Sequence, residues 1–214
     1  MIRSSTRTTH VCLGNECGRR KRRSFPSTFI FSSRTMSLTS IVPFDWFEIH
    51  SNSRSPQLRV GHSATFVSSS SKIYILGGAN PSECFADLHS LSLPSKQSET
   101  CLWTKLLDDI PALRRYEHSA ILSSDEPEKI IFFGGANTET NFNDIHALDI
   151  PSKTIEDCTP IDNQLVSPRT HHSSCRIQGG LFIFSGGSQG ARAVDDAELY
   201  RFDLGNIIAS TPFI

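Results

Sequence analysis

Hydrophobic residues along the chain fall into three similar sets of short runs. Each set begins with the pattern R-x-x-H-S, continues with a fully apolar run that ends near a pair of glycines, and finishes with a segment in which apolar and polar residues alternate. The R-x-x-H-S segments are Arg59–Ser63, Arg115–Ser119 and Arg169–Ser173, and their histidines are 56 and 54 residues apart. A fixed period of about 50 residues predicts a repeat architecture.

The runs in each set predict β-strands. A run in which successive residues are all apolar is typical of a strand buried on both faces, and alternation is typical of a half-buried strand. The fully apolar runs are Ile73–Leu76, Ile130–Phe133 and Leu181–Phe184, and the alternating segments are Leu88–Leu93, Ile145–Ile150 and Leu199–Leu204. No stretch of ten or more residues has the 3.6-residue apolar period of a helix, so the sequence predicts almost no helix.

A glycine pair follows each fully apolar run. The pairs are Gly77–Gly78, Gly134–Gly135 and Gly186–Gly187. Because glycine tolerates positive φ and a close approach of backbone, we expect each pair to end its strand where the chain turns. The pairs lack the following helix and the Lys-Ser/Thr of a P-loop, so they do not indicate a phosphate site.

Four short strands per unit, with 52 to 57 residues between glycine pairs, indicate the blades of a β-propeller. Trp46 and Trp103 mark the outer strand of a blade, and Ile155 stands at this position in the next unit. The repeats span residues 46–204, which is about three blades, whereas propellers close with four to eight. The predicted fold is all-β and an incomplete propeller, with uncovered blade faces that favour association.

These features resemble the kelch-repeat β-propeller family. More specific motifs, at Gly77–Pro81, Arg114–His118, Phe133–Asn137 and Phe184–Ala191, resemble the N-terminal half of the kelch-motif effectors of Rab GTPases. The resemblance implies a six-bladed propeller of which this chain carries about three blades. It also implies non-enzymatic binding to a GTP-loaded late-endosomal Rab GTPase in endosome-to-trans-Golgi transport. A generic kelch scaffold or adaptor for another protein partner is the alternative.

The resemblance also implies that the loops before the first strand and after the second strand of each blade gather on one face. There, guanidinium groups pair with carboxylates, amides bind backbone groups, and tyrosine is a common interface anchor. The residues predicted to bind a partner are Arg59, Asn80, Arg115, Tyr116, Asn137, Arg169, His171 and Gln189. In the alternative, each arginine holds the fold by binding carbonyls of the neighbouring blade, and Tyr116 packs between blades.

Residues that recur once per unit are predicted to hold the fold. The predicted structural kelch positions are His62, Gly77, Gly78, Trp103, His118, Gly134, Gly135, His172, Gly186 and Gly187. We expect each recurring histidine to hydrogen-bond a neighbouring strand or turn rather than a metal ion. We expect Asp87, Asp144 and Asp196, which precede the alternating segments, to hold turns through backbone N–H groups.

No catalytic, metal or cofactor site is predicted. The iron pattern E-x3-D-x3-H of some plant kelch proteins is approached by Glu83 and Asp87, but Leu91 stands in place of the third ligand. Neither a G-x-S-x-G nor an H-E-x-x-H motif occurs. The six cysteines have no repeated spacing, which argues against a disulfide framework or a zinc module. The longest apolar runs have four residues, so no transmembrane segment is predicted.

Charge is unevenly distributed along the chain. Residues 1–40 carry eight Lys or Arg and one Glu, a net charge of +7, which leaves −8 for the other 174 residues. This Ser- and Arg-rich leader has no apolar periodicity and is predicted to be disordered. A transit peptide, a nuclear-localisation cluster at Arg19–Arg23 and a mis-assigned extension before a start at Met36 stay open as alternatives. The total of −1 argues against a duplex nucleic-acid binder.

The predicted organisation is a disordered leader at residues 1–40, three kelch repeats at 41–204 and a short tail at 205–214. Trp46–Ile49 would be the outer strand of a blade whose other strands the chain does not encode, so we expect a truncated product, a splice form or an incomplete gene model. The expected location is the cytoplasm, with peripheral recruitment to endosomal membranes through the partner.

Overall fold

The computed structural model describes residues 3–4, 47–48, 51–94, 100–123, 128–162, 165–188 and 192–205. The chain divides into two compact units, Met1–His50 and Ser51–Ile214. In the first unit β1 (Arg3–Ser4) pairs antiparallel with β2 (Phe47–Glu48). The rest of the predicted disordered leader, Trp46 and most of the predicted tail lie outside the described residues.

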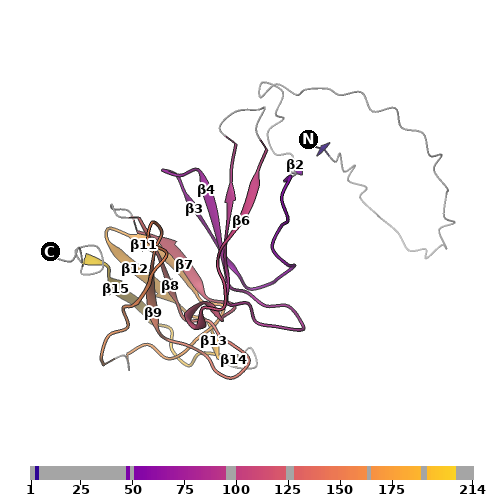
Figure 1. The fold of residues 1–214 in the computed structure, drawn as a ribbon. Helices are drawn as coiled ribbons and strands as arrows, with labels where there is room; N and C mark the ends of the chain where they lie inside the picture. Colours follow the sequence, from indigo (N-terminus) through magenta and orange to yellow (C-terminus); the bar gives the residue numbers. More distant parts are fainter. Residues whose placement is uncertain are drawn as a thin grey trace, which may run out of the picture. The chain divides into compact units, whose positions relative to one another are not determined.

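The second unit is built from antiparallel sheets that follow one another along the chain (Figure 1). Blade 1 has the strand order β3 (Ser63–Val67), β4 (Lys72–Leu76), β5 (Leu88–Ser92) and β6 (Leu102–Leu107). Blade 2 has the order β7 (Ser119–Leu122), β8 (Lys129–Phe133), β9 (Ile145–Asp149) and β10 (Ile155–Asp157). In both blades each strand pairs with the next strand in sequence, as expected of propeller blades.

Blade 3 has three described strands. Its order is β11 (Ser173–Ile177), β12 (Gly180–Phe184) and β15 (Leu199–Asp203). A two-stranded hairpin of β13 (Gly187–Ser188) and β14 (Arg192–Ala193) lies in the loop between β12 and β15. The sheets do not close into a ring, so the all-β, incomplete propeller predicted from the sequence is confirmed.

Strand registers align the three repeats residue by residue. Leu76 pairs with Ser63 and Leu88, Phe133 pairs with Ser119 and Ile145, and Phe184 pairs with Ser173 and Leu199. The last residue of the second strand is thus held between equivalent partners in every blade. The outer strands also align, because Trp103 pairs with Leu91 and Ile155 pairs with Leu148. The sequence prediction of Ile155 at the tryptophan position agrees with this register.

The hydrophobic core lies between blades. One cluster joins Tyr74 and Leu76 of blade 1 to Ile130 and Phe132 of blade 2. A second cluster joins Ile131, Phe133, Ile145 and Ala147 of blade 2 to Leu181 and Ile183 of blade 3. All residues of Ile130–Phe133 are at most 1% exposed, as the fully apolar pattern of this strand predicted. Burial between sheets is the main stabilising term for such a stack.

Helical structure among the described residues includes a 3-10 turn, η2 (Pro111–Leu113), before the second R-x-x-H-S segment. Pro111 favours this turn because its fixed φ suits the first turn of a helix. Leu113 is completely buried in the cluster between blades 1 and 2. Among the residues placed by the structure, no helix has the length and apolar character needed to cross a membrane.

Candidate functional site

The three R-x-x-H-S segments take the same path at one end of their blades. In each segment, the second residue forms an isolated antiparallel β-bridge with the third residue after the second strand of the blade. These bridges join Val60 to Ala79, Tyr116 to Ala136, and Thr170 to Gly187. In blade 1 the Val60 amide donates to the Ala79 carbonyl at 2.8 Å, and the Ala79 amide donates back at 2.9 Å. The loops before the first strand and after the second strand therefore lie together in every blade.

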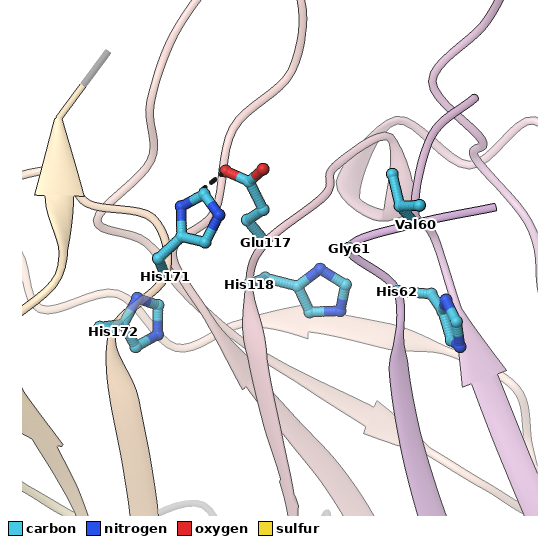
Figure 2. A pocket seen from close by; sticks show the side chains of 7 residues that line it. All are labelled: Val60, Gly61, His62, Glu117, His118, His171 and His172. Carbon is cyan, nitrogen blue, oxygen red and sulfur yellow. Dashed lines mark ion pairs between the residues drawn. The ribbon is translucent and has the colours of Figure 1, made fainter. Parts of the chain in front are cut away.

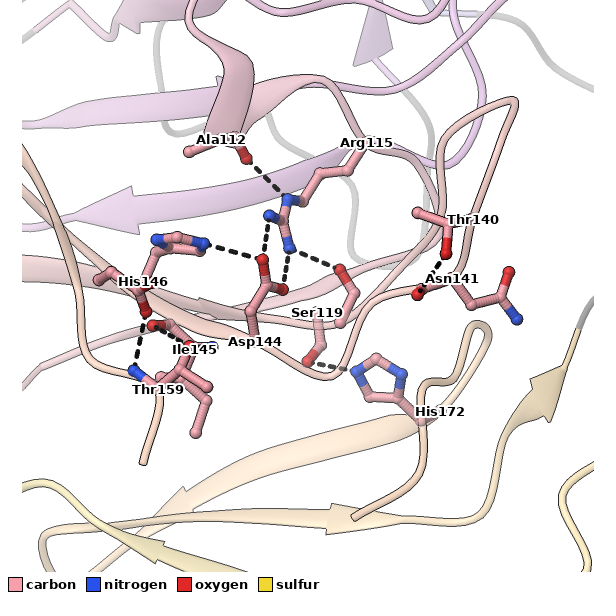
Figure 3. A network of polar contacts seen from close by, with 12 residues as sticks. Ala112, Arg115, Ser119, Thr140, Asn141, Asp144, Ile145, His146, Thr159 and His172 are labelled. Atoms are coloured by element: carbon pink, nitrogen blue, oxygen red, sulfur yellow. Dashed lines mark hydrogen bonds and ion pairs between the residues drawn. The ribbon is translucent and has the colours of Figure 1, made fainter. Parts of the chain in front are cut away.

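Arg115 ties these two loops together inside blade 2 (Figure 3). Its side chain is only 2% exposed and donates to both carboxylate oxygens of Asp144, at 2.7 and 2.8 Å. The guanidinium also donates to the Gly134 carbonyl at 2.9 Å and to the Ala112 carbonyl in η2 at 2.7 Å. It lies 4.6 Å from the centre of the Phe142 ring, which adds a cation–π contact. The guanidinium is thus fully engaged within its own repeat.

The other two arginines form the same clamp. Arg59 donates to Asp87 at 2.5 and 3.0 Å, and Arg169 donates to Asp196 at 2.8 and 3.4 Å. Each also donates to the carbonyl at the end of the second strand of its own blade, at 2.8 and 3.0 Å. The arginine side chains are at most 4% exposed. They bind carbonyls as in the fold-holding alternative, but in their own blade rather than the neighbouring one, and their role in partner binding stays a prediction.

The clamp carboxylates also accept hydrogen bonds from histidine. The Nε2 atoms of His89 and His146 lie 3.0 and 2.9 Å from Asp87 and Asp144. Burial alone would raise the pKa of each carboxyl, but these bonds and those from arginine outweigh it and hold both pKa values well below the usual range. The expectation that Asp87 and Asp144 hold turns through backbone N–H groups is wrong, because their described partners are arginine and histidine side chains.

In blade 3 a tyrosine takes the place of the histidine that bonds to the clamp carboxylate. Tyr200 stands in the register position of the two histidines, and its hydroxyl bonds to Asp196. The hydrogen bond from Arg169 is the main reason that the pKa of Asp196 is lowered. The guanidinium lies 5.2 Å from the centre of the Tyr200 ring. The clamp is therefore kept in blade 3 although its histidine is not.

The recurring histidines link each blade to the one before it. His118 Nε2 lies 2.8 Å from Ser63 Oγ of blade 1, and His172 Nε2 lies 2.8 Å from Ser119 Oγ of blade 2. Both rings are nearly buried, and burial, with the charge of the nearby arginine, lowers the pKa of His118 to about 3 and that of His172 to about 4. Both imidazoles are therefore neutral at pH 7. The expected hydrogen bond to a neighbouring strand is thus present for His118 and His172, whereas none is described for His62.

The surface formed by the three R-x-x-H-S segments contains a hollow with a volume of about 390 Å³ (Figure 2). The lining residues are Val60, Gly61, His62, Glu117, His118, His171 and His172. At its rim the Nδ1 atom of His171 lies 3.1 Å from a carboxylate oxygen of Glu117, and the His171 side chain is 61% exposed. All three repeats thus contribute to one polar depression whose rim faces solvent.

Similarity to known proteins agrees with this geometry. Residues 14–206 match the family described as the KLHDC2/KLHL20/DRC7 Kelch-repeats domain. The chain belongs to the kelch-repeat family. It is 36% identical to the Rab9 effector protein with kelch motifs of Mus musculus, over 78% of this chain and 44% of that protein. For the Homo sapiens protein of the same name the identity is 35%, over 78% of this chain and 45% of the relative.

The kelch chain spans about half the length of the curated relatives that it matches. Among solved structures, that of YjhT is similar with a TM-score of 0.52 and 17% sequence identity. The match covers 70% of this chain and 47% of YjhT. At this identity the likeness shows a shared fold alone.

The predicted amides on this kelch face hold their own loops. Asn80 Oδ1 accepts from the amides of Ser82 and Glu83 at 2.8 and 2.9 Å, and Asn137 Oδ1 accepts from the two equivalent amides in its loop, each at 2.8 Å. Both side chains are partly exposed beside the bridge that joins the two loops. Gln189, the third predicted amide, lies outside the described residues. The hydroxyl of Tyr116 donates to the Asn137 carbonyl at 3.3 Å.

The third glycine pair, Gly186–Gly187, begins one residue further from the end of its strand than the other two pairs. Phe184 is equivalent to Leu76 and Phe133, so Ser185 and Gly186 stand where the first two repeats have their glycine pairs, and Gly187 bridges like Ala79. Ser185 has a φ of 57°, close to the 57° and 63° of Gly77 and Gly134. Gly186 is therefore equivalent to the second glycine of the other two pairs, and Gly187 follows it at the bridging position.

The first glycine of each of the other two pairs lies against the next blade. A Cβ on Gly77 would meet the Arg115 carbonyl at 2.5 Å, and a Cβ on Gly134 would meet the Arg169 carbonyl at 3.0 Å. These carbonyls belong to the following repeat, and Ser185 has no following repeat among the described residues. The second glycine instead approaches its own blade, since a Cβ on Gly186 would meet the Thr170 carbonyl at 2.7 Å. The second position therefore requires glycine in every blade, including the last.

Sequence reasoning missed the arginine–carboxylate clamp. A regular spacing could have revealed it, because arginine and aspartate are 28, 29 and 27 residues apart in the three repeats. Within the described part of the chain, no group of three or more His, Cys, Asp or Glu side chains is arranged to hold a metal ion.

Proposed function

We propose that this kelch chain is a non-enzymatic protein-interaction module that binds a GTP-loaded Rab GTPase of the Rab9 type. The identity of about 35% to the Rab9 effector proteins with kelch motifs, over most of this chain, is the observation that carries the proposal. The stretch that matches the kelch family, residues 14–206, holds all three R-x-x-H-S segments, so the face that these segments build would be shared with the relatives.

The partner is proposed to contact the rim of the hollow and the surface beside it. His171 and Glu117 supply an exposed ion pair, and Tyr116 supplies a partly exposed aromatic ring. Val60 and Leu58, which are 71% and 91% exposed, add apolar surface before the first strand. An aromatic and apolar centre with a polar rim is the usual composition of a protein–protein interface. The partly exposed amides of Asn80 and Asn137 would extend the rim.

The clamp arginines are proposed to act on this face as positioning residues. Each guanidinium bonds to the loop after the second strand and to the carboxylate before the third strand. It thereby fixes the loops that carry the exposed side chains, which lowers the entropy lost on binding.

The proposed cellular role is endosome-to-trans-Golgi vesicle transport, with recruitment from the cytoplasm to endosomal membranes through the Rab partner. A generic kelch scaffold for another protein is the alternative. The two differ in whether binding depends on the nucleotide, because an effector distinguishes the GTP-bound state and a scaffold of another kind does not.

The test is calorimetric titration of the full 214-residue chain with Rab9 loaded with a non-hydrolysable GTP analogue or with GDP. We expect binding to the GTP form that is at least about tenfold tighter than to the GDP form. Tyr116→Ala should weaken it by about tenfold or more, as expected for an aromatic anchor. Lys153→Ala is the matched control, because Lys153 is exposed in the turn at the other end of β9.

Equal affinity for both nucleotide states would replace the effector proposal with the scaffold alternative. No binding of either form, by a chain whose far-UV circular dichroism shows folded β-sheet, would overturn it. Equal losses in Tyr116→Ala and Lys153→Ala would place the contact elsewhere on the blades.

A further inference from the structure

Ser167 adds a hydroxyl to the clamp of blade 3 that the other two clamps lack. It stands two residues before the clamp arginine Arg169, where blades 1 and 2 have Gln57 and Leu113. The Ser167 hydroxyl accepts a hydrogen bond from Nη2 of Arg169 at 2.9 Å, and the Ser167 carbonyl accepts one from Nε at 3.0 Å. Blade 3 is thus the one described blade in which a serine side chain shares the guanidinium with the aspartate.

Ser167 is accessible although its hydroxyl contacts a buried arginine. The residue is exposed and lies in a segment without regular secondary structure. Asn143 Nδ2, in the loop between β8 and β9, donates to the Val166 carbonyl at 2.8 Å. The Arg169 amide donates to the Phe142 carbonyl in the same loop at 3.0 Å. Ser167 therefore lies at the junction of blades 2 and 3, both of which the structure describes.

Ser167 and Pro168 form a Ser-Pro pair, which is the motif that proline-directed protein kinases modify. The sequence has one other such pair, Ser55–Pro56, before the first R-x-x-H-S segment. Ser55 is also exposed, but its hydroxyl bonds to no arginine among the described residues. The two pairs therefore carry the same sequence signal in different surroundings.

A phosphate on Ser167 would enter a second surface hollow, which contains a further cation. This hollow has a volume of about 460 Å³, and Ser167, Arg192, Asp195 and Asp196 are among its lining residues. The Arg192 side chain is 78% exposed and lies 3.8 Å from the Asp195 carboxylate, which is too long for a hydrogen bond. Phosphoserine carries a charge of about −2 and three strong acceptor oxygens, so it can bind both Arg169 and Arg192.

The clamp of blade 3 is the weakest of the three in its geometry. The longer of its two bonds, from Arg169 Nη1 to Asp196 Oδ1, measures 3.4 Å, against 3.0 and 2.8 Å in blades 1 and 2. The other oxygen of Asp196 lies 2.8 Å from Arg169 Nη2, the same nitrogen that bonds to Ser167. A phosphate on Ser167 therefore competes with the carboxylate for one nitrogen and repels it, because both groups are anions.

We propose that Ser167 is a phosphorylation site, and that its phosphate takes Arg169 from Asp196 and opens the clamp of blade 3. The modifying enzyme is a proline-directed Ser/Thr protein kinase with Mg·ATP as co-substrate. The Ser167 oxygen forms a bond to the γ-phosphorus of ATP, and the bond from that phosphorus to the β–γ bridging oxygen breaks, so that ADP leaves. The hydroxyl proton passes to a base of the kinase.

Release of Asp196 loosens the loop between β14 (Arg192–Ala193) and β15. In the unmodified chain this loop is held by the clamp and by the Val194 amide, which donates to the Gly186 carbonyl at 3.1 Å. The loop is part of the chain that follows the second strand of blade 3. The inference does not use the Rab partner, so it can fail while the proposed function holds, and the reverse is also true.

The test treats the full chain with a cyclin-dependent kinase or a mitogen-activated protein kinase and Mg·ATP, and locates phosphate by mass spectrometry of peptides. We expect Ser167 to be modified in the folded chain. Hydrogen exchange of the amides in residues 192–200 should then become about tenfold faster or more, because the clamp that closes this loop is open. Ser167→Glu, which needs no kinase, should change exchange in the same direction by a smaller factor.

The second Ser-Pro pair provides the matched control. Ser55→Ala should leave both the phosphate on Ser167 and the faster exchange unchanged, whereas Ser167→Ala should abolish both. Asp196→Asn tests the mechanism separately, because it weakens the clamp without a phosphate. Exchange of residues 192–200 in this variant should already be fast, and phosphorylation of Ser167 should accelerate it little further.

Three results would overturn the proposal. Neither kinase modifies Ser167 in the folded chain, phosphate on Ser167 leaves the exchange of residues 192–200 unchanged, or phosphorylation accelerates exchange as strongly in Asp196→Asn as in the unaltered chain.

Discussion

Blade 2 and blade 3 have the same strand register and the same arginine clamp, yet their second strands differ in burial. In β8 the residues Ile130–Phe133 are at most 1% exposed, because a blade lies on each side. In β12 the side chains of Leu181 and Ile183, which face blade 2, are at most 2% exposed, whereas Phe184 is 47% exposed. A fully apolar second strand is thus suited to contact a blade on each of its two faces. The burial of its side chains depends on whether both of these blades are present.

The clamp behaves differently from the core in this comparison. Arg115 and Arg169 are both nearly completely buried, and both have a bidentate contact with an aspartate of the same blade. The polar framework of a blade is therefore local, and the apolar framework is shared between blades. Substitutions at equivalent positions of blades 2 and 3 should separate the two contributions.

The largest difference is expected for the phenylalanine at the end of the second strand. Phe133→Ala should lower the free energy of unfolding by about 3–5 kcal/mol, since it removes a fully buried ring. Phe184→Ala should lower it by about 1 kcal/mol, because half of that ring is already in water. Urea unfolding followed by tryptophan fluorescence measures both, at a protein concentration where the chain is monomeric. Equal losses would show that β12 is covered in the monomer.

Acid should destabilise the contacts between blades before it affects the clamps. The pKa values of His118 and His172 lie near 3 and 4, below the value of about 6.5 expected in the unfolded chain. The unfolded state therefore binds more protons, and stability is fully present above pH 6.5 and falls as the pH decreases toward 4. Each imidazole should contribute a loss of about 2 kcal/mol between pH 7.5 and 5.

Urea unfolding at a series of pH values measures this loss. His118→Gln should reduce the pH dependence, whereas His62→Gln should change it least, because the His62 side chain is exposed. A further loss is expected below about pH 4, where the lowered pKa values of Asp87 and Asp144 make the folded chain bind fewer protons than the unfolded chain. Unchanged stability from pH 7.5 to 5 would contradict the burial of the two histidines.

The turn after the second strand should respond in opposite directions in the two blades. Gly134→Ala places a Cβ at a φ of 63°, 3.0 Å from the Arg169 carbonyl, and should cost about 2 kcal/mol. Ser185→Gly removes a side chain from a φ of 57° and should stabilise the dilute chain by about 1 kcal/mol. Thermal unfolding monitored by circular dichroism checks the signs. A destabilised Ser185→Gly chain would show that the Ser185 side chain makes a contact that the turn needs.

Much of this fold could be predicted from the sequence, because the repeat places equivalent residues at fixed positions. The period predicted the three blades, and recurrence of His118 and His172 predicted their bonds to a neighbouring strand. In blade 3 the equivalence of Ser185 and Gly186 with the two glycines of the other repeats could not be predicted from the sequence, because the adjacent glycines there are Gly186 and Gly187. The strand register shows this equivalence.

The site was harder to predict because the same residue types serve the interior and the surface. Arginine in a loop suits partner recognition and also suits a buried clamp, and the choice depends on a carboxylate 27 to 29 residues away. The hollow lined by His62, Glu117 and His171 could not be predicted either, since it depends on how neighbouring blades are placed. Contacts within a repeat can be predicted from the spacing of residues along the sequence. Contacts between repeats can be predicted only when the relative placement of the blades is known.

The smallest effect is expected for the serine that begins each first strand. Ser119→Ala leaves the buried His172 ring without its partner at 2.8 Å and should cost about 1 kcal/mol. Ser173→Ala removes an exposed hydroxyl and should not change the stability of the monomer. Chemical unfolding of both variants at low protein concentration makes this measurement. If Ser173→Ala also costs about 1 kcal/mol under those conditions, Ser173 has a partner within the single chain, and the contrast between an interior and an open blade is lost at this position.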